Sequence, residues 1–163
     1  SGTVNTALLN HFLKDDYLTL SAPKSTGREY FNMDWVNKNI SQFLQSSASN
    51  LAQEKQLIAE DIQATLTALT AQTITDQVRL LSTKANVYLC GGGTLNTYLF
   101  NLIKQNLINF NVTSSDTINI NSDALEASAF AWFAYAFDKK ITGNIPAVTG
   151  ARKEAVLGIE YQP

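Results

Sequence analysis

The sequence has 163 residues, of which 45% are hydrophobic and 16% are charged, a composition that suits one folded domain or one lobe of a larger protein. A net charge of −2 without a basic cluster excludes the electrostatic footprint of a nucleic-acid binder. A single cysteine, Cys90, and a single histidine, His11, exclude an internal disulfide and the usual ligands of a structural zinc site.

The sequence also contains neither an apolar run long enough to span a membrane nor a charged-then-apolar signal segment. We therefore expect a soluble, cytoplasmic protein that uses no membrane partner. One lone cysteine fits a reducing compartment as well.

The first 50 residues are predicted to contain two amphipathic helices. Apolar residues recur at helical spacing from Thr3 to about Leu13, with Thr3 available as the N-cap. The second helix follows Asn32 or Asp34 as its cap and ends at the polar segment 45–50.

The segment between these helices, from Asp15 to Phe31, reads as a loop. Its sequence Pro23-Lys-Ser-Thr-Gly-Arg-Glu-Tyr-Phe-Asn32 is dense in turn-forming and charged residues, and loops of this length in compact domains are often functional. Lys24 and Arg28 could face an anionic group. The alternative is that they only keep the loop solvated.

The longest periodic segment runs from Ala59 to Leu81. Its apolar residues fall near one stripe, and Glu60 and Asp61 complement the helix dipole in the first turn. This segment is predicted to be a core helix.

The stretch Val87-Tyr-Leu-Cys-Gly-Gly-Gly-Thr-Leu-Asn96 predicts a strand, a tight turn and a helix that begins near Thr94. Gly91, Gly92 and Gly93 let another molecule approach the backbone closely, and a helix N-terminus suits a phosphate or nucleotide. Asn96 adds a side chain that both donates and accepts hydrogen bonds. The alternative is a close strand-to-helix crossing that needs glycine only for packing.

A second short strand is predicted over residues 110–113, which completes a parallel strand, helix, strand crossover. The segment from Ser122 to about Phe137 is apolar almost all round, so we expect a helix buried between layers or against a partner domain. Asp123 and Glu126 share a face at its start, where an N-terminal capping pair is the simpler interpretation.

The end of the sequence gives weaker signals. Gly143-Asn-Ile-Pro146 marks a loop, and residues 156–161 form a last candidate strand that Gly158 weakens.

Four stretches in order resemble the C-terminal part of the anhydro-N-acetylmuramic acid kinase family. They are Pro23 to Asn32, Asp61-Ile-Gln-Ala-Thr-Leu-Thr-Ala-Leu-Thr-Ala71, Cys90-Gly-Gly-Gly-Thr-Leu-Asn96 with Asp123-Ala-Leu-Glu-Ala-Ser-Ala-Phe-Ala-Trp132, and Pro146-Ala-Val-Thr-Gly-Ala151. The resemblance spans nearly the whole chain, whereas a lone Gly-Gly-Gly-x-x-Asn would be shared with many sugar kinases.

The resemblance implies a helix-rich α/β fold with a small sheet, as the C-terminal lobe of the actin-like ATPase and sugar kinase (ribonuclease H-like) superfamily. It implies ATP and Mg²⁺ in a cleft between two lobes, and hydrolysis and O6 phosphorylation of anhydro-N-acetylmuramic acid in peptidoglycan recycling. Gly91, Gly92, Gly93 and Asn96 would line the nucleotide, and Glu126 would face the sugar.

The family's first phosphate segment and its general-base aspartate have no equivalent here and are expected upstream of Ser1. Residues 1–163 would then be a single C-terminal lobe without catalytic or metal-binding residues of its own, and inactive in isolation. An apolar face left exposed by the missing lobe predicts self-association, for example as a homodimer.

Two other classes of function stay open from the sequence alone. One is a non-catalytic nucleotide- or sugar-binding module that keeps the glycine turn. The other is an all-helical interaction domain in which the glycine triplet is only a tight corner.

Overall fold

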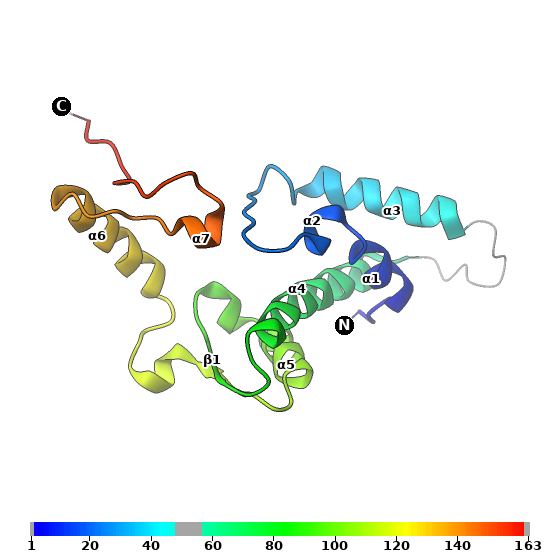
Figure 1. Cartoon of the computed structure of the whole chain (residues 1–163). Helices are drawn as coiled ribbons and strands as arrows, with labels where there is room; N and C mark the ends of the chain where they lie inside the picture. The colour runs from blue at the N-terminus through cyan, green and yellow to red at the C-terminus, as the bar shows by residue number, and fades with distance from the viewer. Residues whose placement is uncertain (1, 48–56, 162–163) are drawn as a thin grey trace. The chain divides into compact units, whose positions relative to one another are not determined.

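The computed structural model describes residues 2–47 and 57–161. These residues form helices joined to one small sheet (Figure 1). The helices are α1 (Thr6–Phe12), α2 (Asp16–Thr19), α3 (Met33–Ser47), α4 (Ala59–Leu81), α5 (Thr97–Asn106), α6 (Leu125–Asp138) and α7 (Pro146–Thr149). The remaining elements are the strands β1 (Asn86–Leu89) and β2 (Asn111–Ser114) and the 3₁₀ turns η1 (Gly92–Leu95) and η2 (Ser115–Ile118).

The contacts of the chain group into two compact units. The first unit takes in the residues up to Leu20 together with Thr26–Val87 and Leu95–Val112. The second takes in Ser21–Ser25, Tyr88–Thr94 and the chain from Thr113 onward. Each unit is described by itself below.

The first unit is built around α4, which packs against both α1 and α5, while α1 also packs against α3 (Figure 1). Leu8 and Phe12 on α1 meet Leu69 on α4 in a buried cluster, and Trp35 of α3 stacks on Phe12 with ring centroids 5.1 Å apart. Burial of such side chains is the main favourable term in folding. The predicted core helix is confirmed, and its first and last residues, Ala59 and Leu81, are those expected from the sequence.

The first helix begins later than its apolar pattern indicates. Asn5, not Thr3, is the N-cap of α1, because its side-chain oxygen accepts a hydrogen bond of 3.0 Å from the Leu8 amide. The Thr3 amide instead donates to the Asp61 carboxylate on α4. Of the two caps predicted for α3, Asn32 or Asp34, the structure has Asn32, whose side chain accepts from the Trp35 amide at 2.9 Å.

The predicted loop from Asp15 to Phe31 contains one short helix, α2, which the sequence pattern missed. Asp15 is its N-cap and accepts hydrogen bonds at both carboxylate oxygens: Oδ1 from the Tyr17 amide and the Tyr30 hydroxyl, and Oδ2 from the Trp35 indole. This one carboxylate therefore ties α2, the end of the loop and α3 together. The second helix was expected to end at the polar segment 45–50. In the structure α3 continues to Ser47, and residues 48–50 lie outside the described part of the chain.

The sheet is small, as expected for a helix-rich α/β chain. Strands β1 and β2 pair in parallel, with α5 as the crossover between them. The last candidate strand is wrong: residues 156–161 adopt no regular secondary structure. A strand needs a partner for its backbone groups, and glycine at position 158, with φ +119°, disfavours an extended ladder.

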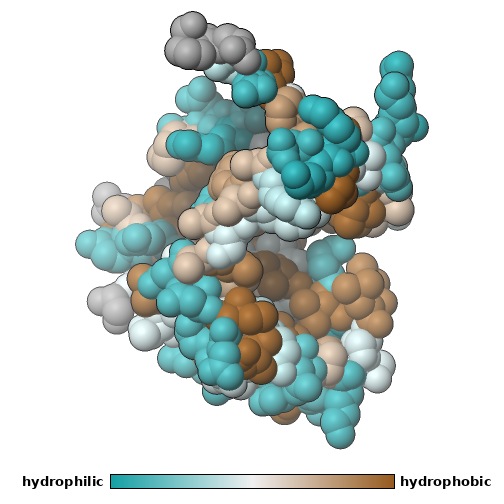
Figure 2. Space-filling view, turned by 90° about the vertical axis from the view of Figure 1, so that its left-hand side faces the viewer, coloured by the Kyte–Doolittle hydropathy of each residue, from teal (hydrophilic) through white to brown (hydrophobic). Residues whose placement is uncertain are grey.

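Helix α6 belongs to the second unit and is exposed along most of its length. Of its described side chains only Ala136 is buried, whereas Phe130, Trp132 and Tyr135 are 67%, 46% and 56% exposed. Burial of this helix between layers of its own unit is therefore a wrong prediction, because the described residues of that unit place no second layer over it. Cover by a partner domain stays a prediction. Figure 2 shows further apolar side chains at the surface on one face.

The segment after α6 turns back along that helix. The Gly143 amide donates to the Ala155 carbonyl at 2.9 Å, and the Asn144 side chain bonds the backbone of Lys153 and Ala155. The loop predicted around Gly143 to Pro146 is present, and α7 starts at the proline, the residue type that best tolerates a first helical position. Within the described ranges, no helix combines the length and the apolarity needed to cross a membrane.

Candidate functional site

The glycine turn after β1 is held by three hydrogen bonds. Gly91 has φ +78°, and its amide donates to the Ser122 carbonyl at 2.9 Å. The Gly91 carbonyl accepts from the Thr94 amide at 3.0 Å and from the Thr94 hydroxyl at 2.8 Å. The backbone of the corner is thus fixed by the chain's own groups, and only glycine reaches the positive φ at position 91 without strain.

Space is open above the corner. A Cβ built on Gly91 or on Gly92 would meet no atom within 4 Å, and Gly92 and Gly93 are both exposed. A close strand-to-helix crossing would instead place backbone or side chains against these positions. In this structure packing therefore does not explain why positions 91 and 92 carry glycine.

The helix after the corner begins three residues later than predicted. Residues Gly92–Leu95 form the 3₁₀ turn η1, and α5 starts at Thr97 with Asn96 as its N-cap. The Asn96 side-chain oxygen accepts from the Leu99 amide at 3.0 Å. Glycine propagates an α-helix poorly, and asparagine is among the best N-caps, so the cap decides where the helix begins. The predicted start near Thr94 is wrong for this reason.

A second polar group supports the corner from the turn after β2. Asp116 accepts at Oδ1 from the Ser122 amide at 3.0 Å and at Oδ2 from the Ser114 hydroxyl at 2.5 Å. The hydrogen bond from Ser114, with that from the Ser122 backbone, holds the pKa of Asp116 below its ordinary value. Asp116 therefore positions Ser122, whose carbonyl in turn accepts from the Gly91 amide.

Glu126 lies exposed in the first turn of α6. The capping-pair interpretation of Asp123 and Glu126 is wrong, because the N-cap of α6 is Ala124 and no side chain caps the helix. The Asn121 side-chain oxygen accepts from the amides of Asp123 at 3.0 Å and Ala124 at 2.8 Å in the turn just before the helix. Among the residues described, none donates a hydrogen bond to the Glu126 carboxylate, which leaves it available to a ligand.

The predicted site residues divide between the two units. Gly91, Gly92, Gly93 and Glu126 belong to the second unit, and the Gly91–Ser122 hydrogen bond joins the corner to the segment just before α6. Asn96 belongs to the first unit, where it caps α5. Asp116, Ser122 and Asn121, which shape the corner and the start of α6, were not singled out from the sequence. The short Ser/Asp/Asn spacings from 114 to 122 are the signal that could have found them.

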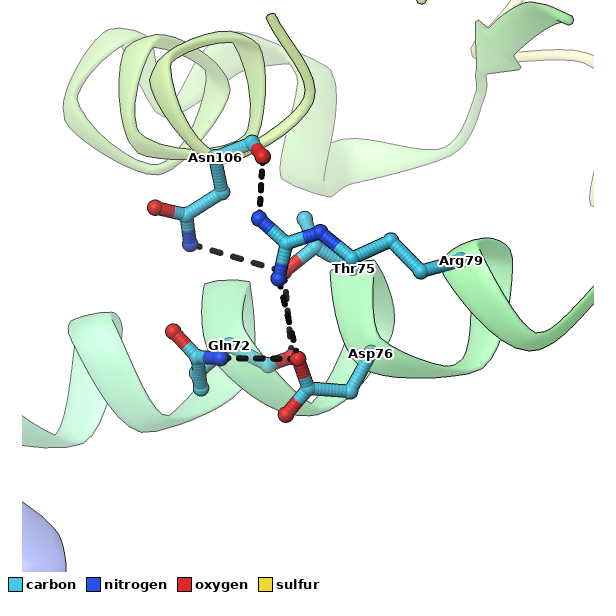
Figure 3. Close-up of polar contacts among 5 residues, drawn as sticks. All are labelled: Gln72, Thr75, Asp76, Arg79 and Asn106. Carbon is cyan, nitrogen blue, oxygen red and sulfur yellow. Dashed lines mark hydrogen bonds and ion pairs between the residues drawn. The ribbon is translucent and has the colours of Figure 1, made fainter. Parts of the chain in front are cut away.

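In the first unit, a polar cluster fixes the end of α5 against α4 (Figure 3). The Arg79 guanidinium donates to the carbonyl of Asn106, the last residue of α5, and to Asp76 at 3.1 Å. Gln72 also donates to Asp76, at 2.8 Å, and the Asn106 side chain reaches the buried Thr75 hydroxyl at 3.5 Å. Helix α5 is thereby fixed at both ends, by Asn96 at its start and by Arg79 at its finish.

A Mg²⁺ ion was expected with the nucleotide. Across 2–47 and 57–161, no three His, Cys, Asp or Glu side chains gather closely enough to hold a metal ion. The described residues therefore do not fit a complete magnesium site.

Comparison with known proteins adds an independent line of evidence. The family model described as anhydro-N-acetylmuramic acid kinase matches residues 1–163. Among similar curated proteins, anhydro-N-acetylmuramic acid kinases from Colwellia psychrerythraea and Hahella chejuensis are each 42% identical, over 100% and 99% of this chain. One from Shewanella pealeana is 38% identical over 99%. The chain spans only 40–42% of the length of these relatives.

Proposed function

Because the chain belongs to the anhydro-N-acetylmuramic acid kinase family, we propose that it forms the C-terminal, nucleotide-side part of an ATP-dependent sugar kinase. The whole protein would add water at C1 of anhydro-N-acetylmuramic acid, break the C1–O6 bond of the anhydro ring and transfer the γ-phosphoryl group of ATP to O6. The products are N-acetylmuramic acid 6-phosphate and ADP. We place this reaction in peptidoglycan recycling.

The single observation that carries the nucleotide assignment is the open glycine corner. Its backbone is held by the Ser122 carbonyl and the Thr94 side chain, so it is rigid before a ligand arrives. Among the described residues, no atom lies within 4 Å of a Cβ built on Gly91 or on Gly92. Pre-organised backbone with room above it lets the flat and anionic parts of a nucleotide approach at low entropic cost.

We assign different roles to the residues around this corner. Gly92 and Gly93 would contact the nucleotide through their backbone. The Asn96 side-chain oxygen is committed to the cap of α5, which leaves its amide group as the donor to a nucleotide. Glu126, with a carboxylate that accepts no hydrogen bond from the described residues, would accept from a sugar hydroxyl or amide.

The chemistry requires groups that we place outside this chain. The attacking water needs a general base, which we assign to an aspartate in the remainder of the parent protein. Phosphoryl transfer also needs charge stabilisation by Mg²⁺ and by donors from both sides of the transferred group. We therefore propose that the 163-residue chain is the C-terminal lobe of an actin-like fold and has no kinase activity alone.

Two measurements test this proposal. Titration of the chain with ADP should give saturable binding that Gly92→Val abolishes, because a branched side chain would occupy the open space. Ala151→Val, which adds a branched side chain at another exposed position, serves as the matched control. A coupled kinase assay on the same chain should show no sugar-dependent ADP production. Sugar-dependent turnover by the chain alone would contradict the proposed division of labour.

The sugar-facing role of Glu126 is tested in the full-length protein. Glu126→Gln should raise KM for the anhydro sugar much more than KM for ATP, since only the sugar would lose its acceptor. Asp123→Asn, three residues away, is the control. Equal losses for both substrates, or for neither, would remove the assignment.

A further inference from the structure

A pocket of about 690 Å³ opens within the first unit, apart from the glycine corner in sequence. Residues of α2, α3 and α4 and of the loop before α3 line it. Its apolar lining includes Leu18, Phe31, Trp35, Val36, Leu66 and Leu69. Pockets that hold small molecules usually have volumes in this range, with mostly apolar walls and a few polar groups.

The packing of the unit explains why the pocket exists. Helix α1 packs against both α3 and α4, and the Phe12 side chain of α1 is fully buried beneath Trp35. Helix α1 thus bridges α3 and α4 on one side. The pocket is the space that remains between α3 and α4. Trp35 is fixed there because its indole N–H donates to Asp15 at 2.8 Å and Phe31 meets its ring edge-on.

The polar groups of the lining are unequal in what they can offer a ligand. Asn32 uses its oxygen for the Trp35 amide and its amide group for the Glu29 carbonyl. The hydroxyls of Thr70 and Thr73 donate to carbonyls of their own helix at 3.0 and 3.1 Å. Arg28 is the charged residue of the lining, and it makes no hydrogen bond or ion pair with the residues that the structure describes.

The charge balance of the pocket is therefore one-sided. Among the residues that the structure describes, no acidic side chain lines it. A guanidinium presents a planar fork of donors that matches a carboxylate or a similar oxyanion. An apolar cavity with one unpaired arginine at its wall selects a molecule that has an apolar body and one anionic group. It discriminates against cations and against neutral molecules of the same shape.

From this arrangement we propose that the pocket between α3 and α4 binds a small amphiphilic monoanion, with Arg28 as the anion-recognising residue and Trp35 and Phe31 as the aromatic wall. The pocket is lined by residues of the first unit, whereas the glycine corner belongs to the second, and the proposal does not depend on the proposed kinase activity.

The test uses 4-phenylbutyrate as the probe and 4-phenyl-1-butanol as its neutral counterpart, followed on the ¹⁵N-labelled chain. The chain has two tryptophans, so the spectrum carries two indole N–H signals, which Trp132→Phe assigns. Trp132 lies on α6 in the other unit and serves as an internal control for binding to exposed apolar surface.

We expect the carboxylate to shift the Trp35 signal in a saturable manner while the Trp132 signal stays in place. The alcohol should bind about tenfold more weakly, the effect of losing one charge-assisted hydrogen bond. Arg28→Gln should reduce the affinity for the carboxylate to that for the alcohol and leave the alcohol unchanged. Arg152→Gln, which removes the same charge in the other unit, should change neither.

A third variant checks the location. Thr70→Phe, at an exposed helical position in the lining, should weaken both probes because its ring fills the pocket. Equal affinities for the two probes, an unaltered carboxylate affinity in Arg28→Gln, a shift of Trp132 in place of Trp35, or no saturable shift up to the solubility limit would each overturn the proposal.

Discussion

Gly91 and Gly92 are neighbours that need glycine for different reasons. Gly91 has a positive φ of +78° and donates its amide to Ser122, whereas Gly92 has neither a positive φ nor a close neighbour. We predict that Gly91→Ala lowers the free energy of unfolding by about 1–2 kcal/mol through backbone strain. Urea denaturation monitored by circular dichroism measures the difference.

Gly92→Ala is the matched control for that change. It should alter the free energy of unfolding by less than about 0.5 kcal/mol, as for other surface positions. Equal destabilisation by the two alanines would show that strain at position 91 is not what distinguishes them.

Some hydrogen bonds of individual residues can be predicted from the sequence, and others depend on residues far away in the chain. The sequence narrows the cap of α3 to Asn32 or Asp34, because suitable side chains stand at the start of a clear apolar pattern, and the structure decides for Asn32. Thr3 and Asn5 are both suitable caps for α1, and the choice between them depends on Asp61, 58 residues away, which accepts from the Thr3 amide. The hydrogen bonds from Tyr30 and Trp35 to Asp15 also cannot be predicted from the sequence, because these residues approach Asp15 only after the loop has folded.

At the level of elements, the turn after β2 depends on the ionised carboxylate of Asp116. Its pKa is lowered by the Ser114 hydroxyl and the Ser122 amide, so the folded state favours the charged form. The resulting stabilisation is complete above the ordinary aspartate pKa of about 4 and is lost as the pH falls through the lowered folded-state pKa.

Asp116→Asn should therefore destabilise the chain at neutral pH, and its difference from the unmodified chain should shrink on acidification. Urea denaturation at a series of pH values down to about 3 measures this. Asp123→Asn should show no such dependence relative to the parent chain. A difference that is constant with pH would mean that ionisation of Asp116 does not stabilise this turn.

The contact between α4 and α5 rests in part on Arg79. Its bonds to the Asn106 carbonyl and to Asp76 span the two helices, so Arg79→Ala should cost about 1 kcal/mol. Hydrogen exchange should accelerate most at the C-terminal amides of α5. Arg152→Ala is the control, and unchanged exchange in α5 would contradict the role given to Arg79.

Elements differ in how far their sequence determines them. The first and last residues of α4 could be predicted because its apolar stripe continues over many turns, and every turn places apolar residues on the same face. The start of α5 was not, since a run of glycines gives no periodicity and a local side chain sets the boundary. The strand predicted after residue 155 failed because β-structure requires a pairing partner, which no local pattern contains.

At the scale of the whole molecule, α6 carries an apolar surface that the described residues of its own unit leave exposed. We predict concentration-dependent self-association through Phe130, Trp132 and Tyr135, which are each about half exposed or more. Phe130→Ser should shift the weight-average mass in sedimentation equilibrium toward the monomer.

The control for this prediction is Ile108→Ser, at a residue that is 86% exposed in the first unit. It removes an exposed apolar side chain of comparable character without touching α6. A parent chain that sediments as a monomer at all concentrations would contradict self-association, and an equal effect of both variants would mean that α6 has no special part in it.

The composition and the ordered motifs predicted a helix-rich α/β chain and its family, whereas the exposure of α6 could not be predicted. An apolar helix has the same sequence signature whether it is covered by its own chain or by another. The chain spans only 40–42% of the length of its relatives. Residues outside this chain are therefore one possible source of cover for α6.

The hydrogen bond from Gly91 to Ser122 joins the glycine corner to the backbone immediately before α6, the helix that carries Glu126. If ADP binds at this already fixed corner, it should further restrict the backbone that the Gly91–Ser122 bond joins to α6, so the sugar would meet a carboxylate that is held more firmly. Thermodynamic linkage makes this effect reciprocal: the factor by which nucleotide tightens sugar binding equals the factor by which sugar tightens nucleotide binding. A single backbone contact would then make the proposed nucleotide and sugar sites bind their ligands cooperatively.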